Sequence, residues 1–289
     1  MQNGNIKMEN KELGPFKVET AKLAVKGLKL GTFTFNPQAI YVDDLGKTKT
    51  FDLQPVTVTV NPRAPRERVA GKISSGTPKL DHLLLGGLPE NYAIALSAPS
   101  SDERETLVDR FLKAGVEAGE ITFHITVDPG NTKTLAEKHQ SNFYVLLCSP
   151  LADSMLANLP NVYKLKGVEN LTEIDIALTK AFRTLDPSAI SPRRICLNVI
   201  SDVLLQHHVV NTRRWLSTLL PTLKSKGFTV LAVIDPAIHP SEETQAVLGL
   251  FEGEISIHDK ETTKGISRFL KIRKMTGQKY LKNETSLEE

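Results

Sequence analysis

Strand-like and helix-like segments alternate along most of the chain, and this alternation restricts the fold more than any other feature. From residue 91 onward, short apolar runs such as NYAIALSAP, EITFHITVD and FTVLAVIDP are separated by segments with helical spacing. Parallel strands need crossover connections of this length, and such crossovers are right-handed. We therefore predict an α/β domain with a mostly parallel sheet that helices cover on both faces.

The composition sets the size and the compartment of this domain. A chain of 289 residues, 40% of them hydrophobic, suffices for one large domain and a small one, and a net charge of +3 selects neither nucleic acid nor membrane as a partner. Cys148 and Cys196 both lie in apolar, strand-like runs, which favours a reduced protein over a disulfide framework. Because no signal peptide and no apolar run of about 18 residues is present, we expect a soluble, cytoplasmic protein.

The N-terminal part has a different pattern. Period-two alternation over residues 13–62 predicts a small antiparallel β module, and an edge extension of the main sheet is the alternative. We expect residues 1–12 to be a disordered tail, residues 63–74 a linker, residues 75–283 the α/β domain and residues 284–289 a second tail. The linker arginines Arg63, Arg66 and Arg68 are expected to be solvated. A module this short needs to dock on its neighbour or on another chain.

The turn after the first central strand, residues 98–106, lies where an open parallel sheet binds its ligands. Its sequence, APSSDERET, is also typical of a helix start. Either Ser100 or Ser101 would be the N-cap, and acidic residues in the first turn would face the positive end of the helix dipole.

The residues before this turn carry a family resemblance. Residues 75–91, SGTPKLDHLLLGGLPEN, resemble the TG-P-LD-LLGGGLP signature of the RecA superfamily, above all of its archaeal KaiC-like and RadA-like branch. Later segments, among them RRICLNVISDVLL and FLKIRKMTGQKYL, extend the resemblance to about residue 281. The resemblance implies a RecA-like, P-loop NTPase fold, with a nucleotide-binding loop at residues 98–106.

Several positions that hold nucleotide in the family are changed here. The family loop, S-G-P-P-G-S-G-K-T-T-L, needs glycines so that its backbone N–H groups point at one anion, a lysine on the phosphates and a hydroxyl on Mg²⁺. Carboxylates in this loop would repel a polyphosphate by about 4 kcal/mol per pair of charges at about 4 Å. The corresponding residues are Ala98, Ser101 and Glu103 at the glycine positions, Arg104 for the lysine, Glu105 for the hydroxyl with Thr106 next to it, Asp128 for the acid near the attacking water, and Asn198 for the Walker B aspartate. The lysine and arginine that in the family reach across a subunit boundary to the γ-phosphate correspond to Lys274 and Thr276.

Two further patterns have ordinary explanations. The histidines, among them His207 and His208, lack metal-ligand spacing, so we expect no metal site. The basic run over residues 260–282, with Phe269 and Tyr280 interleaved, suits either a nucleic acid backbone or an edge strand with one wet face.

Together these features predict a catalytically inactive KaiC-like protein that is a regulatory or protein-interaction subunit, with no catalytic residue and no cofactor. Its partner would be an active family member or a second copy. One alternative is an ATPase that binds ATP and Mg²⁺ through Arg104 and Asp128 and remodels a partner. A second alternative is a RadA-like accessory that binds single-stranded DNA through Lys271, Arg273 and Lys274.

Overall fold

The computed structural model describes residues 31–43, 45–60, 69–185, 192–262 and 265–287. It divides the chain into two compact units, residues 1–65 and residues 66–289. The predicted disordered tail, the predicted strands before residue 31 and the first half of the predicted linker, residues 63–68, lie outside the described residues.

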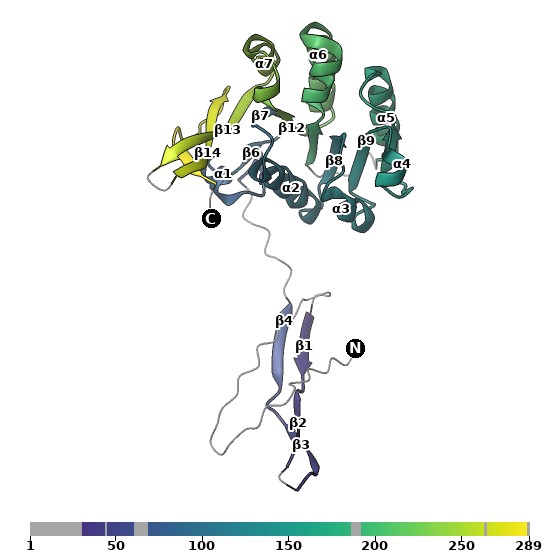
Figure 1. Ribbon diagram of the computed structural model, residues 1–289, viewed down its shortest axis with the longest axis vertical. Helices are drawn as coiled ribbons and strands as arrows, with labels where there is room; N and C mark the ends of the chain where they lie inside the picture. The colour runs from purple at the N-terminus through teal and green to yellow at the C-terminus, as the bar shows by residue number, and fades with distance from the viewer. Residues whose placement is uncertain (1–30, 44, 61–68, 186–191, 263–264, 288–289) are drawn as a thin grey trace. The chain divides into compact units, whose positions relative to one another are not determined.

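The larger unit is built on a nine-stranded sheet, which confirms the predicted α/β class (Figure 1). Seven neighbouring strands run parallel, and the last two pair antiparallel at one end. In spatial order the strands are β10 (Val162–Leu165), β9 (Phe143–Cys148), β8 (Ile121–Thr126), β11 (Arg193–Asn198), β12 (Phe228–Ile234), β7 (Ala93–Ser97), β13 (Gly253–Thr262), β14 (Gly265–Met275) and β15 (Glu284–Ser286).

Helices cover both faces of this sheet (Figure 1). One face carries α1 (Pro78–Leu83), α2 (Asp102–Glu117), α3 (Thr132–Lys138) and α4 (Ala152–Met155), and the other carries α5 (Leu171–Arg183), α6 (Ile200–Ser225) and α7 (Ser241–Leu248). Successive residues of β7 alternate between the two cores: Ala93 and Ala95 pack under α5–α7, whereas Ile94 and Leu96 pack under α1–α4. A strand buried on both faces explains the continuous apolar run.

The segment before β7 is held by close backbone contacts. It contains β5 (Lys72–Ile73) and β6 (Leu88–Pro89), which pair antiparallel. Gly76 has φ +77°, and a Cβ on it would lie 2.1 Å from the carbonyl oxygen of Arg110 in α2. The Asp81 carboxylate accepts hydrogen bonds from the Ser74 hydroxyl (2.6 Å) and the Ser75 N–H (2.7 Å). Gly76, one of the residues of the RecA-like signature, therefore lets this segment pack closely against α2.

A buried ion pair joins the same segment to the sheet. Arg194 in β11 donates from Nε to Glu120 (2.6 Å), and both side chains are almost fully buried. Its Nη1 donates to the carbonyl oxygens of Ser74 (3.0 Å) and Phe111 (2.7 Å). A Cβ at Gly115 would lie 2.4 Å from the Arg194 side chain, so α2 needs glycine there to pass over the guanidinium.

Four elements differ from the prediction. The segment before Lys166, to which no element was assigned, contains α4 and the edge strand β10. Residues 284–286, expected to be part of a tail, form β15 against β14. The helix after β11, which the sequence pattern predicts over residues 212–227, begins already at Ile200, and His208 interrupts it with φ 57°. Across the described residues, no helix has the length and apolar character needed to cross a membrane.

The smaller unit is a β-ribbon. Its strands are β1 (Gly31–Phe35), β2 (Gln38–Val42), β3 (Thr48–Asp52) and β4 (Val56–Val60). β2 and β3 form an antiparallel hairpin, and β1 and β4 pair antiparallel outside it. The Asp43 carboxylate accepts the N–H groups of Leu45 (3.0 Å) and Lys47 (2.9 Å) and so closes the hairpin turn.

Candidate functional site

The turn between β7 and α2 lies at the carboxyl edge of the parallel strands, next to the end of β12. This edge is where open α/β sheets bind ligands, and the N-terminus of α2 points to it. Ser97 is level with Ile234 of β12, and Ala98, which is fully buried, donates its N–H to the Ile234 carbonyl oxygen (3.0 Å). The turn is thus anchored to β12 before α2 begins.

Asp235, the residue after β12, holds this turn. Its Oδ2 accepts the Ser100 N–H (2.9 Å), and its Oδ1 accepts the N–H of Ala237 (2.9 Å). The Asp235 N–H in turn donates to the Ser201 hydroxyl (2.9 Å), and only 7% of Asp235 is exposed. A backbone N–H of the turn, which would be available to a bound anion, is therefore bonded to a carboxylate of the chain itself.

Arg104 is fully engaged by neighbouring side chains. Its Nη1 lies 3.5 Å from Asp235, its Nη2 donates to the Ser100 hydroxyl (3.1 Å), and its Nε and Nη2 both donate to Glu105 (3.1 and 2.9 Å). Each guanidinium nitrogen thus has a protein acceptor. The one cation at the lysine position is neutralised by two carboxylates.

The start of α2 is a self-capped helix end. Ser101 is the N-cap, and its hydroxyl accepts the Arg104 N–H (3.3 Å), which confirms the predicted cap. Glu103 forms an ion pair with Arg268 of β14. Burial would raise the pKa of Glu103, but hydrogen bonds from its own N–H and from Arg268 lower it overall. Asp102, Glu103 and Glu105 all face the positive end of the helix dipole.

The two cysteines are buried thiols with raised pKa values. Burial, with a smaller contribution from Asp202, raises the pKa of Cys148 to about 12. Burial likewise raises the pKa of Cys196, with Glu105 and Asp109 adding to the effect. Thiols held in the neutral form are poor nucleophiles. Of these carboxylates, Glu105 belongs to the turn itself, where its charge also opposes a polyphosphate.

The other residues predicted for the site are spread along the sheet. Glu105 and Thr106 are exposed on α2, and exposed Asp128 bonds its own loop through the Gly130 N–H (2.9 Å). Asn198 is half-buried at the end of β11, level with Thr126. Lys274, which the resemblance assigns to a site across a subunit boundary, lies away from the turn of its own chain. It pairs with Glu254, which is level with Ala95 in the middle of β7, and β14 lies two strands, about 10 Å, from β7.

These residues do not fit Mg²⁺ and ATP. The anion position at Ser100 is taken by Asp235, Arg104 is paired, and the Walker B position is neutral at Asn198. Within the part of the chain that the structure describes, no cluster of three or more His, Cys, Asp or Glu side chains is arranged to hold a metal. His207 instead contacts the carbonyl oxygen of Val168 through Nε2 (2.7 Å).

Sequence reasoning missed Asp235, the residue that organises the turn. A signal was present, since Asp235 directly follows a central strand and precedes a proline. Its partner Ser100 is 135 positions away, and neither the β7–β12 pairing nor its register can be read from local pattern.

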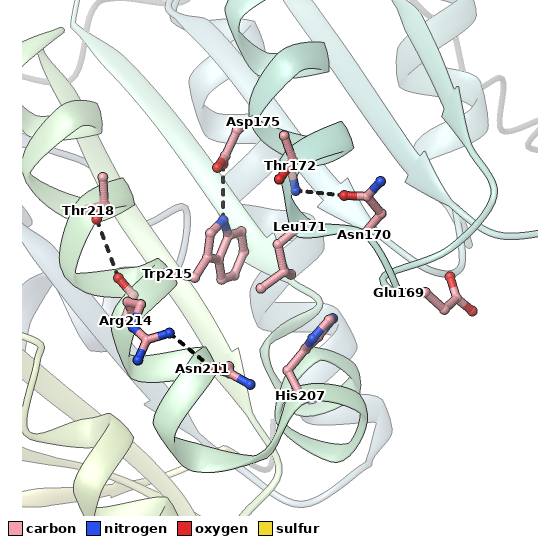
Figure 2. Close-up of a pocket in the computed structure, with 10 residues that line it drawn as sticks. All are labelled: Glu169, Asn170, Leu171, Thr172, Asp175, His207, Asn211, Arg214, Trp215 and Thr218. Carbon is pink, nitrogen blue, oxygen red and sulfur yellow. Dashed lines mark hydrogen bonds between the residues drawn. The ribbon is translucent and has the colours of Figure 1, made fainter.

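A separate cavity of about 370 Å³ lies between α5 and α6 (Figure 2). Trp215 forms one wall, and its Nε1 donates to Asp175 (3.0 Å). Burial raises the pKa of Asp175, and the Trp215 hydrogen bond partly offsets the effect. The lining mixes acidic, basic and amide side chains, among them Glu169, Arg214 and Asn211, and shares no residue with the turn.

Comparisons with known proteins agree with this architecture. Residues 73–288 match the family model described as the KaiC ATPase. The KaiC-like protein PH0186 from the archaeon Pyrococcus horikoshii OT3 has a similar fold, with a TM-score of 0.59 at 19% identity; the match covers 75% of this chain and 94% of that one. No curated protein sequence matches the chain. Because the family model covers most of its length, this chain belongs to the KaiC ATPase family.

Proposed function

We propose that this chain is a family member that does not hydrolyse ATP and acts as a regulatory or protein-interaction subunit. The observation that carries the proposal is the Asp235 carboxylate on the Ser100 N–H and beside Arg104. A turn that satisfies its own donors offers little to a phosphate, and the acidic first turn of α2 adds repulsion. The N-terminal β-ribbon, outside the α/β domain, is the proposed docking element for the partner.

Calorimetry of the purified full chain with Mg²⁺ and ATP, and with a non-hydrolysable analogue, tests this proposal. We expect no binding heat and no phosphate release. Arg104→Ala is the matched variant, because an atypical ATPase that binds through Arg104 would lose its affinity in this variant. Micromolar ATP binding with Mg²⁺-dependent turnover in the unmodified chain would refute the proposal.

A further inference from the structure

The N-terminal ribbon changes register at one point, and this change sets which side chains share a face. Across β2 and β3, Ala39 pairs with Phe51, and the same register continues to the Leu53 N–H, which donates to the Pro37 carbonyl oxygen (3.0 Å). Across β1 and β4, Phe35 pairs with Val56. Two residues, 54 and 55, therefore lie opposite the single residue 36, which is the two-to-one pairing of a β-bulge.

The bulge places apolar residues of all four strands on the same face of the ribbon. Side chains two positions apart share a face, so the extra residue places Val56 on the same side as Leu53 and Phe51. Phe35 and Tyr41 lie on that side as well. We call these five residues the apolar face: Phe35, Tyr41, Phe51, Leu53 and Val56. They are 45–62% exposed.

The opposite face is more polar. Gln38 donates to Asp52 across the strands (2.8 Å), and the hydroxyls of Thr34 and Thr57 lie 3.4 Å apart. Two apolar residues lie there, Ile40 opposite Thr50 and Val42 opposite Thr48, and both are exposed. The two faces of the ribbon thus differ in character, as they do in a sheet packed on one side.

We infer that the apolar face is a self-association surface, on which the ribbon of a second copy packs face to face. This inference rests on the docking role proposed above and names the occupant. A two-stranded ribbon is marginal in water unless its apolar face is covered, and no described residue within the ribbon itself covers this one.

The exposed area suits a second copy. An aromatic side chain has a surface of about 150–250 Å², so the exposed fractions of Phe35, Tyr41 and Phe51 amount to roughly 300 Å² of exposed area. Leu53 and Val56 raise the exposed area of the apolar face to roughly 450 Å². Two such faces would together bury about 900 Å² of apolar surface, close to the ~1,000 Å² expected of a specific interface before the polar rim is counted.

The charge distribution also suits pairing with an identical surface. Residues 31–60 carry two lysines and three aspartates, a net charge of −1, so two ribbons repel weakly. The charge on the apolar face is Lys49, which lies at its end and pairs with Asp43 (2.9 Å). A strongly charged partner would find no complementary charge on this face, whereas an equally apolar copy needs none.

Sedimentation and crosslinking of the full chain test the inference. We expect a concentration-dependent dimer, and we expect Phe51→Asp to abolish it, while Thr50→Asp on the opposite face leaves it intact. Cys148 and Cys196 are buried, so a short bis-maleimide will report on an introduced cysteine. Leu53→Cys, at the centre of the apolar face, should crosslink to its copy, and Thr50→Cys should not, even if Phe51→Asp disturbs the ribbon.

A chain that stays monomeric at all concentrations would overturn the inference, because another segment or partner would then be the occupant. Equal crosslinking of both cysteines, or of neither, would also overturn it, since edge-to-edge pairing or contacts between α/β domains would be responsible. These readouts are independent of ATP, so a monomer that fails to bind ATP would contradict only the self-association.

Discussion

Replacing Asp235 by alanine removes the acceptor that closes the turn before α2. Two backbone N–H groups, of Ser100 and Ala237, lose a carboxylate partner at 2.9 Å. A hydrogen bond to a charged group contributes about 1.5–3 kcal/mol. Because water can reach this edge, we take the low end for each bond, and the Arg104 contact at 3.5 Å adds little. We expect the free energy of unfolding to fall by about 3 kcal/mol, which for a domain of this size lowers Tm by about 6–12 °C.

Urea unfolding followed by tryptophan fluorescence is the assay, because the chain has a single tryptophan, Trp215, in α6 of the α/β domain. Asp235→Asn keeps an acceptor for the Ala237 N–H but loses the charge, so its effect should be about half as large. Asp153→Ala is the control: its carboxylate is 92% exposed and pairs with Lys164 (3.1 Å), so its loss should cost less than about 1 kcal/mol.

A loss below about 1 kcal/mol in Asp235→Ala would refute the argument that this carboxylate holds the turn. The same samples also separate the two causes of the misfit with nucleotide. If Mg²⁺ and ATP raise the Tm of Asp235→Ala but not that of the unmodified chain, Asp235 alone excludes the phosphate, and the repulsion assigned to Glu103 and Glu105 is wrong.

Three further predictions concern the domain around the site. Glu120→Gln should lower the free energy of unfolding, measured by urea unfolding, by about 3–5 kcal/mol, because it leaves the buried Arg194 charge uncompensated. Glu252→Gln is the control: its pair with Lys224 is partly exposed, so the same measurement should change by less than about 1 kcal/mol. Burial lowers the pKa of His124 from 6.5 to about 3, so as pH falls the unfolded chain takes up a proton before the folded chain does. The free energy of unfolding should therefore be unaffected by this group above pH 6.5 and fall by about 1.4 kcal/mol per pH unit below it. His124→Leu should remove this part of the pH dependence in urea titrations between about pH 7.5 and 5. Gly76→Ala should lower Tm strongly, because its Cβ would meet the Arg110 carbonyl oxygen and its φ is +77°; Gly119→Ala, with φ +73° but open space, should cost less.

The sequence predicts those parts of the fold that local pattern controls. β7 and β12 are continuous apolar runs, and α2 has a serine cap and an acidic first turn, so each can be recognised alone. β10 and β15 were missed because edge strands of three or four half-buried residues carry no clear alternation. The resemblance assigns Lys274 to the site of a neighbouring subunit, so its place in β14 of a single chain leaves that prediction untested.

Asp235 shows why the site itself was harder to predict than the fold. A helix N-terminus leaves N–H groups without partners inside the helix, and these need an acceptor. In a nucleotide-binding loop the phosphate is that acceptor. Where the loop lacks the glycines and the lysine, as the resemblance implies for this chain, another group must accept these hydrogen bonds, or the turn becomes a point of instability. Here the Ser101 hydroxyl accepts the Arg104 N–H, and the Asp235 carboxylate, at the end of the neighbouring strand, accepts the Ser100 N–H. The residues that differ from the family loop point to this turn, whereas Asp235 comes to it through the pairing of β7 with β12, which local sequence pattern does not give.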